Sequence, residues 1–259
     1  MADQIDHLIE DAPILRLDAV HTDIRQYHIL NGVDLVVPRG QVTMLLGRNG
    51  VGKTTTLRSI MGHWRIHRGS ITFNGADIST QPTADIARAG IGYVPEDMGI
   101  FSDLTVEENM QLAAFSGPMS ATRLGWIFAT FPPLKTLWHT EAGHLSGGQK
   151  QMLSVARAMI EERELYIIDE PTKGLAPAIV ATMVRALQDL KDQGASILMV
   201  EQNFAVAAAL GDTAHVMVDG AVKWSGPMRA LAEDLDLQRS LMGFSLQTAA
   251  RDQSATKSS

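Results

Sequence analysis

Short apolar runs alternate with amphipathic segments along most of the chain. Residues Val42–Leu46, Leu165–Ile168 and Ser196–Val200 are predominantly apolar runs of strand length, as is typical of parallel strands buried on both faces. Residues 177–190 instead repeat apolar side chains at helical spacing, and Gly194 follows where a helix would end. The alternation predicts an α/β domain with a mainly parallel sheet and covering helices.

Two regions depart from this alternation. Residues 14–40 and 70–73 carry short strand-like runs, the latter followed by the turn dipeptide Asn74-Gly75, and they predict an N-terminal antiparallel β layer. Residues 85–145 are mainly helical in pattern, and Thr105 with Glu108 forms a capping-box signature. We therefore expect one domain at 14–246 with an inserted helical lobe at about 85–145, and flexible tails at 1–13 and 247–259.

Composition narrows the classes of function. The 259 residues carry a net charge of −7, which argues against a nucleic-acid partner, and no basic run offsets it. The absence of cysteine excludes disulfides, thiolate metal sites and a cysteine nucleophile. No stretch of about 18 residues is apolar enough to cross a bilayer, so we expect any role in a membrane process to be exerted from outside it.

The phosphate-binding pattern G-x-x-x-x-G-K-[ST] occurs once, between an expected strand and an expected helix. Its residues are Gly47, Arg48, Asn49, Gly50, Val51, Gly52, Lys53 and Thr54, and Thr55 follows in the helix. Glycines allow consecutive backbone N–H groups to face one concavity at a helix N-terminus. Lys53 would reach the β- and γ-phosphates and Thr54 would bind Mg²⁺, so the sequence predicts ATP or GTP binding.

Two adjacent carboxylates follow the apolar run at 165–168. Asp169 and Glu170 would lie at the carboxyl end of a buried strand, where open α/β sheets bind ligands. Asp169 suits a position on Mg²⁺, and Glu170 suits the role of polarising a water in line with the γ-phosphate.

The segment Leu145, Ser146, Gly147, Gly148 and Gln149 precedes another helical pattern. One interpretation is a plain capping box, since Ser146 and Gln149 have the required spacing. The other is an anion site, because two glycines at a helix start leave backbone N–H groups uncovered.

Taken together and in this order, the phosphate loop, the Leu145–Gln149 signature segment and the Asp169-Glu170 strand resemble the ATP-binding subunits of ABC transporters. The resemblance spans about residues 14–246 and implies the ABC form of the P-loop NTPase fold, with ATP and Mg²⁺ as ligands. It also implies a head-to-tail dimer, in which ATP lies between the Lys53 loop of one subunit and the signature segment of the other. Dimer closure and reopening would then drive two transmembrane permease subunits from the cytoplasmic face of the inner membrane.

A finer resemblance is carried by Val94–Glu96, Leu104–Asn109, Glu170–Pro177 and Val200–Asn203. These segments are similar to the second ATPase subunit of importers for branched-chain amino acids, amides or urea. That resemblance implies a periplasmic solute-binding protein as an indirect partner.

Four positions depart from the family pattern. Glu96 stands where glutamine usually senses Mg²⁺, and Gln202 stands where a histidine usually contacts the γ-phosphate. Ala176 replaces a common aspartate. The aromatic that stacks on adenine aligns with Ile24, and the nearby Tyr27 is our candidate substitute. Gln202 and Ala176 together lead to the hypothesis of a non-identical ATPase partner that carries the histidine.

Alternatives remain open at this point. A soluble ABC ATPase, a lipopolysaccharide-exporter ATPase, and a P-loop GTPase or kinase share parts of the pattern, although no guanine motif N-K-x-D is present. Residues 98–101 allow either ordinary packing in the lobe or a groove for a short cytoplasmic helix of the transmembrane subunit.

Overall fold

Two β-sheets form the framework of the protein. The computed structural model describes residues 12–243; the predicted tails lie largely outside this range. The larger sheet has six strands in the order β10-β9-β3-β8-β7-β6. Its strands are β3 (Val42–Gly47), β6 (Ile91–Val94), β7 (Leu165–Asp169), β8 (Ser196–Val200), β9 (Thr213–Val218) and β10 (Ala221–Pro227). All neighbouring pairs are parallel except β9 and β10, which form a hairpin.

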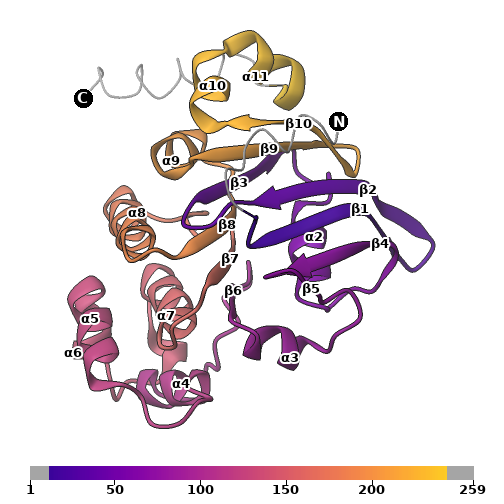
Figure 1. Ribbon diagram of the computed structural model, residues 1–259. Helices are drawn as coiled ribbons and strands as arrows, with labels where there is room; N and C mark the ends of the chain where they lie inside the picture. Colours follow the sequence, from indigo (N-terminus) through magenta and orange to yellow (C-terminus); the bar gives the residue numbers. More distant parts are fainter. Residues whose placement is uncertain (1–11, 244–259) are drawn as a thin grey trace, which may run out of the picture.

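The smaller sheet is antiparallel and lies over one face of the larger one (Figure 1). Its order is β2-β1-β4-β5, with β1 (Leu15–Ile24), β2 (Tyr27–Val37), β4 (Ile66–Phe73) and β5 (Ala76–Asp77). Helix α2 (Lys53–Ile60) packs between the sheets, because Leu57 and Ile60 are fully buried in a core shared by residues of both.

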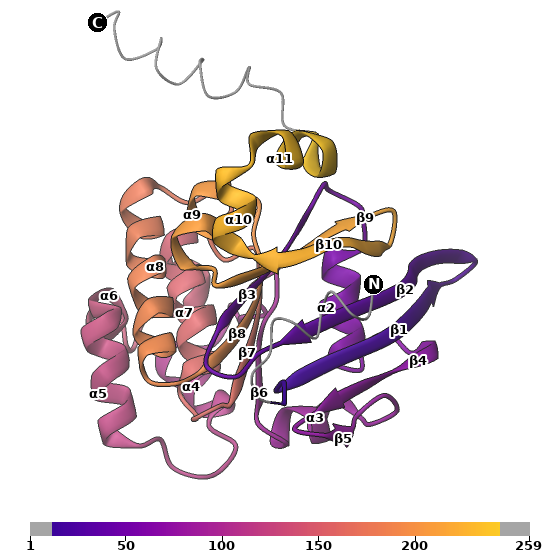
Figure 2. The same ribbon diagram turned by 45° about the horizontal axis from the view of Figure 1, so that its top comes forward.

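Ile86 of α3 (Thr83–Arg88) packs in the same core as α2, whereas the remaining helices cover the opposite face of the large sheet or project beyond it (Figures 1 and 2). They are α4 (Val106–Ala113), α5 (Ala121–Thr130), α6 (Pro132–Thr136), the 3₁₀ turn η1 (Ala142–His144), α7 (Gly147–Met159), α8 (Pro177–Asp192), α9 (Phe204–Leu210), α10 (Met228–Glu233) and α11 (Leu235–Met242). Helices α7 and α8 bury apolar faces against the sheet, as their 3.6-residue periodicity requires.

The helical lobe begins later than its predicted start near residue 85. Residues 91–94 form β6, which pairs in parallel with β7 at the edge of the main sheet. This strand is only four residues long and includes Gly92, so helical signals on both sides masked it. Helices α4, α5 and α6 make up the lobe proper, on one side of the molecule in Figure 1.

The helix cap at Thr105 and the turn at Asp219-Gly220 form where the sequence predicts them. Thr105 caps α4 through a complete capping box, since Glu108 N donates to the Thr105 hydroxyl and Thr105 N donates to the Glu108 carboxylate at 2.8 Å. Asp219 and Gly220 take positive φ in the hairpin turn between β9 and β10. The predicted fold class, a mainly parallel α/β core with an antiparallel β layer and a helical lobe, is confirmed.

Candidate active site

The phosphate-binding pattern forms a loop between β3 and α2 that only glycine can build. Gly47 and Gly52 have φ of 142° and 107°, values that L side chains rarely adopt. A Cβ atom at Gly47 would lie 2.4 Å from the carbonyl oxygen of Met217, and one at Gly52 would lie 2.9 Å from Leu30 Cδ2. The close approach of β9 and β2 to the loop therefore fixes glycine at both positions.

Lys53 begins α2 and directs its ammonium group into the loop. Its Nζ donates hydrogen bonds to the carbonyl oxygens of Gly47 at 2.8 Å and Arg48 at 2.9 Å. Burial lowers the pKa of Lys53, and the carboxylates of Glu170 and Asp169 oppose this shift. A cation held beside unpaired backbone amides at a helix N-terminus is suited to binding phosphate.

Four segments that are distant in sequence meet around this loop. A cavity of about 360 Å³ lies between them. It is lined by Ile29, Asn49, Gly50, Gly52, Lys53, Thr54, Thr55, Glu96, Glu170, Lys173 and Gln202. The topology explains the convergence, because β6 and β7 are neighbouring parallel strands whose carboxyl ends deliver Glu96 and Glu170 to one edge.

Asp169 ends β7 in a setting that suits a metal ion. Its side chain is fully buried, and neither carboxylate oxygen has a hydrogen-bond partner among the described residues. Burial raises the pKa of Asp169 to about 6, while the nearby Thr54 side chain acts in the opposite direction. An orphaned carboxylate beside a hydroxyl is a donor set that fits Mg²⁺ shared with a phosphate.

Glu170 is held in an unusual backbone conformation. Its φ is 49°, in the left-handed region that non-glycine residues seldom occupy, and its N–H donates to the carbonyl of Val200 at 2.9 Å. Gln202 Nε2 donates to Glu170 Oε1 at 2.5 Å. Lys173 Nζ lies 3.2 Å from Glu170 Oε2 and 2.7 Å from Glu96 Oε1. Non-glycine left-handed residues are often found at functional sites, where neighbouring contacts sustain the strain.

The signature segment does form a capping box, as one of its two interpretations predicts. Ser146 caps α7, with Gln149 N donating to its hydroxyl and Ser146 N donating to Gln149 Oε1 at 2.8 Å. Leu145 is buried and anchors the segment, whereas Ser146 and Gly147 are exposed. A Cβ atom at Gly147 would meet nothing within 4 Å among residues 12–243, so packing against this part of the chain does not explain that glycine. The segment does not line the cavity at the phosphate loop.

Tyr27 lies at the start of β2 and is 63% exposed. It does not line the cavity; Ile29, two residues further along the strand, does. The role of Tyr27 toward adenine stays a prediction. Sequence reasoning missed Ile29 and Lys173, although Lys173 lies only three residues after Glu170 and its proximity was a usable signal.

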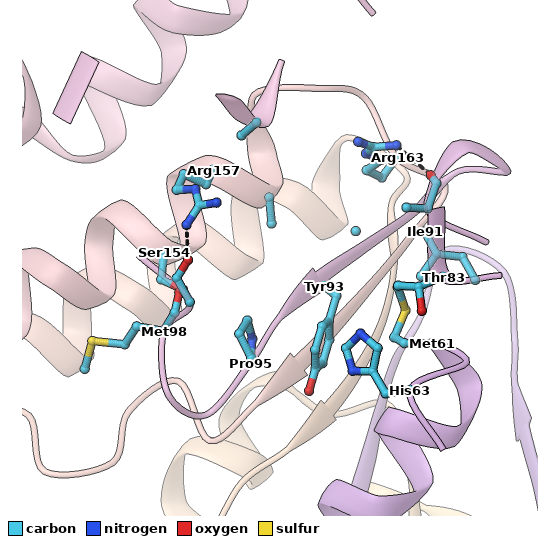
Figure 3. A pocket seen from close by; sticks show the side chains of 15 residues that line it. Met61, His63, Thr83, Ile91, Tyr93, Pro95, Met98, Ser154, Arg157 and Arg163 are labelled. Carbon is cyan, nitrogen blue, oxygen red and sulfur yellow. Dashed lines mark hydrogen bonds between the residues drawn. The ribbon is translucent and has the colours of Figure 1, made fainter. Parts of the chain in front are cut away.

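A second cavity, of about 320 Å³, is lined by Pro95, the residue before Glu96 (Figure 3). Tyr93, Pro95 and Met98 line it from β6 and the following loop, and Ser154 and Arg157 line it from α7. Ser154 Oγ donates to the Met98 carbonyl at 2.7 Å, so the loop after β6 is tied to α7. Phe101, further along this loop, is 49% exposed and packs under the Arg157 guanidinium at 5.1 Å.

The fold and this site define a P-loop nucleotide-binding protein. Residues 30–173 match the ABC transporter family (ABC_tran). The chain is 33% identical over 89% of its length to a probable branched-chain amino acid transport ATP-binding protein, LivF, of Archaeoglobus fulgidus, covering 99% of that protein. It is 34% identical over 81% of its length to the high-affinity branched-chain amino acid transport ATP-binding protein BraG of Pseudomonas aeruginosa, covering 91% of it.

Solved structures agree with this relationship. An ATP-binding subunit of an ABC transporter superposes with a TM-score of 0.76 at 30% identity, covering 92% of this chain and 98% of that one. The ADP conformation of the cassette MJ1267 gives a TM-score of 0.73 at 25% identity, covering 88% and 97%. The chain belongs to the ABC transporter family and is an ATPase of that family. Within residues 12–243, no helix is long and apolar enough to span a membrane.

Proposed function

We propose that this chain powers an importer for branched-chain amino acids or related small amides. The observation that carries the proposal is the 33–34% identity to LivF and BraG across most of the chain. The segments around Glu96, Asn109 and Gln202, which resemble that subgroup in sequence, support it further. The chain would act at the cytoplasmic face of the inner membrane, with two permease subunits and, indirectly, a periplasmic solute-binding protein.

The cavity geometry supports a specific set of roles. The backbone of residues 47–55 would bind the phosphates, and Lys53 would offset their charge. Thr54 and Asp169, with Glu96 nearby, would hold Mg²⁺, which when bound neutralises charge on the phosphates. Glu170 would take up the proton of the attacking water, with Gln202 fixing one of its oxygens.

The exposed signature segment supports a dimer. Ser146 and Gly147 are exposed and do not line the chain's own phosphate-loop cavity, so the Ser146 hydroxyl and the Gly147 N–H would serve a nucleotide on a partner subunit. We propose that this partner is a second, non-identical ATPase subunit. Gln202 cannot carry positive charge, and Ala176 at the N-cap of α8 offers no side-chain cap, which supports unequal sites in a heterodimer.

We assign the loop after Glu96 to contact with the permease. Phe101 exposes an aromatic face beside the second cavity, and Ser154 and Arg157 hold the loop in position. A short helix could lay an apolar face against this surface.

A lipopolysaccharide-exporter ATPase is the second candidate function. The chain is 27% identical over 90% of its length to the LptB protein of Acidithiobacillus ferridurans, covering 98% of it. Exporter-type permeases would then be the partners in place of importer-type ones.

Affinity capture of the complex tests the proposal. The Glu170→Gln chain, held closed with ATP and Mg²⁺, is captured from detergent-solubilised native membranes and its partners are identified by mass spectrometry. We expect two permease subunits and a second ATPase. Recovery of soluble partners alone would contradict it, as would a fully active homodimer of the wild-type chain that transports without a second ATPase.

A further inference from the structure

Lys173 lies between two acidic side chains that belong to different parts of the fold. Its Nζ is 2.7 Å from Glu96 Oε1, on the loop after β6, and 3.2 Å from Glu170 Oε2, after β7. The inference drawn from this contact rests on the proposed role of Glu170 in hydrolysis. Lys173 itself lines the phosphate-loop cavity.

The backbone next to Lys173 is held by a buried carboxylate, that of Glu201. The Thr172 hydroxyl donates to Glu201 Oε2 at 2.8 Å, and Glu201 is buried. The other oxygen of Glu201 accepts the N–H groups of Gln202 at 2.8 Å and Asn203 at 2.9 Å. The segments that carry Lys173 and Gln202 are thus joined to each other, and both reach Glu170.

The segment that carries Glu96 is fixed both to α7, which packs on the sheet, and to α4 of the helical lobe. Ser154 of α7 donates to the carbonyl of Met98, and Arg157 of α7 donates to the carbonyl of Gly99. Asn109 of α4 pairs with both backbone groups of Phe101, at 2.9 Å each. Any displacement of α4 or α7 relative to the sheet would therefore move the Glu96 segment with it.

Charge explains why a cation is needed at this junction. Glu96 and Glu170 both line the cavity, and without Lys173 their carboxylates would repel each other across it. Lys173 has 54% of its side chain exposed, so the pair contributes little to folding stability. The ion pair adds little to the free energy of folding, yet it includes the carboxylate proposed to act in hydrolysis. Its role is therefore better explained by positioning Glu170 than by stabilising the fold.

We propose that Lys173 is a positioning residue that couples the Glu96 segment to Glu170. When the lobe holds Glu96 near Lys173, the ammonium group is shared between the two carboxylates and Glu170 is drawn toward Glu96. When the lobe moves Glu96 away, Lys173 is left with Glu170 alone. The orientation of the Glu170 carboxylate therefore depends on the position of the helical lobe.

The test is a double-mutant cycle on the complex captured through a tag on this chain. The variants are Lys173→Met, Glu96→Gln and the double variant, with Lys173→Arg as the conservative variant. Lys223→Met, an exposed lysine on β10, is the matched control. For each variant, kcat and KM for ATP, the melting temperature, and binding of a fluorescent ATP analogue are measured.

We expect Lys173→Met to lower kcat by about 10-fold or more, since small misplacement of a reacting group is costly. KM and analogue binding should change less than about threefold, and the melting temperature should stay that of Lys223→Met. Lys173→Arg should recover most of the activity. In the Glu96→Gln background the same lysine change should cost about threefold or less, because the Glu96 carboxylate to which Lys173 couples Glu170 is gone.

Three results would overturn the proposal. They are kcat of Lys173→Met within about twofold of wild type, an equal loss in both backgrounds, or a loss that parallels a fall in melting temperature. Glu170→Gln distinguishes failure of this inference from failure of the proposed function. If Glu170→Gln hydrolyses ATP normally, the role of Glu170 itself is wrong; if it is inactive while Lys173→Met is active, only the role of Lys173 is wrong.

Discussion

At the scale of single residues, the site buries two ionisable side chains, Lys53 and Asp169, beside the phosphate loop, and burial disfavours the charged form of each. Lys53 is 5% exposed and Asp169 is fully buried, yet both lie beside the same phosphate loop. Each is destabilised by desolvation in the free protein. A bound metal ion with a nucleotide would relieve both penalties at once.

Two substitutions separate binding from hydrolysis. Glu170→Gln keeps the hydrogen-bonding shape but cannot accept a proton, so hydrolysis should fall by about 100-fold or more while ATP binding persists. Lys53→Ala should weaken ATP binding itself, because the buried cation at Gly47 and Arg48 is lost. Equilibrium binding and steady-state turnover measure the two effects, with exposed Glu233→Gln on α10 as the control. Unchanged turnover in both variants would mean that this site is catalytically silent.

The pKa of Asp169 predicts a pH dependence of folding stability without metal or nucleotide. Because its folded pKa is raised from 3.8 to about 6, the folded state binds more protons in that window, and stability should fall as pH rises through it. Above pH 6 the shift corresponds to a penalty of up to about 3 kcal/mol. The free energy of unfolding is measured with urea in the presence of a metal chelator. The advantage of Asp169→Asn over wild type should grow between pH 4 and pH 6 and stay constant above pH 6. A difference that is independent of pH would contradict this.

At the scale of elements, capping and glycine placement explain why helices begin where they do. The capping boxes at Thr105 and Ser146 have the same spacing and hydrogen-bond pattern, yet only Ser146 belongs to the signature segment. This pair offers a matched test of the two interpretations of that segment.

Thr105→Ala and Ser146→Ala should each lower the free energy of unfolding by about 1 kcal/mol, because each removes one helix cap. Only Ser146→Ala should also reduce ATP hydrolysis by the assembled complex, since its hydroxyl and the neighbouring N–H groups would meet the partner's nucleotide. Chemical denaturation and complex turnover give the two readouts. Equal effects on turnover would leave Ser146 as a helix cap and nothing more.

The strands of the core were readable from sequence because their continuous apolar runs are of strand length and are too short for buried helices. Strand β6 was missed because four residues carry too little periodicity. The positions of Asp169 and Lys53 followed from motif order. The contacts of Glu170 with Gln202 and Lys173 did not, since they depend on a left-handed φ and on which strands are neighbours in the sheet.

At the scale of the whole molecule, the surface beside Glu96 connects the ATPase site to its surroundings. The loop that follows Glu96 presents Asp97 and Phe101 outward while α7 holds it from behind. A permease that contacts this loop would therefore act on the same segment that carries Glu96.

Changes on this surface should uncouple transport from nucleotide binding. Asp97→Lys reverses a charge and Phe101→Ala removes an exposed ring that packs on Arg157, and neither residue lines the phosphate-loop cavity. We expect solute uptake by the complex to fall severalfold with ATP binding intact. Loss of ATP binding would instead assign these residues to packing within the lobe.

ATP-driven uptake by the reconstituted complex tests the central claim most directly. The captured complex is placed in liposomes with its solute-binding protein, and accumulation of labelled leucine is followed with ATP on the cytoplasmic side. We predict accumulation that requires ATP and that is lost when this chain carries Glu170→Gln. Equal accumulation with the wild-type and Glu170→Gln chains, or turnover of ATP without any uptake of branched-chain amino acids or small amides, would contradict the account.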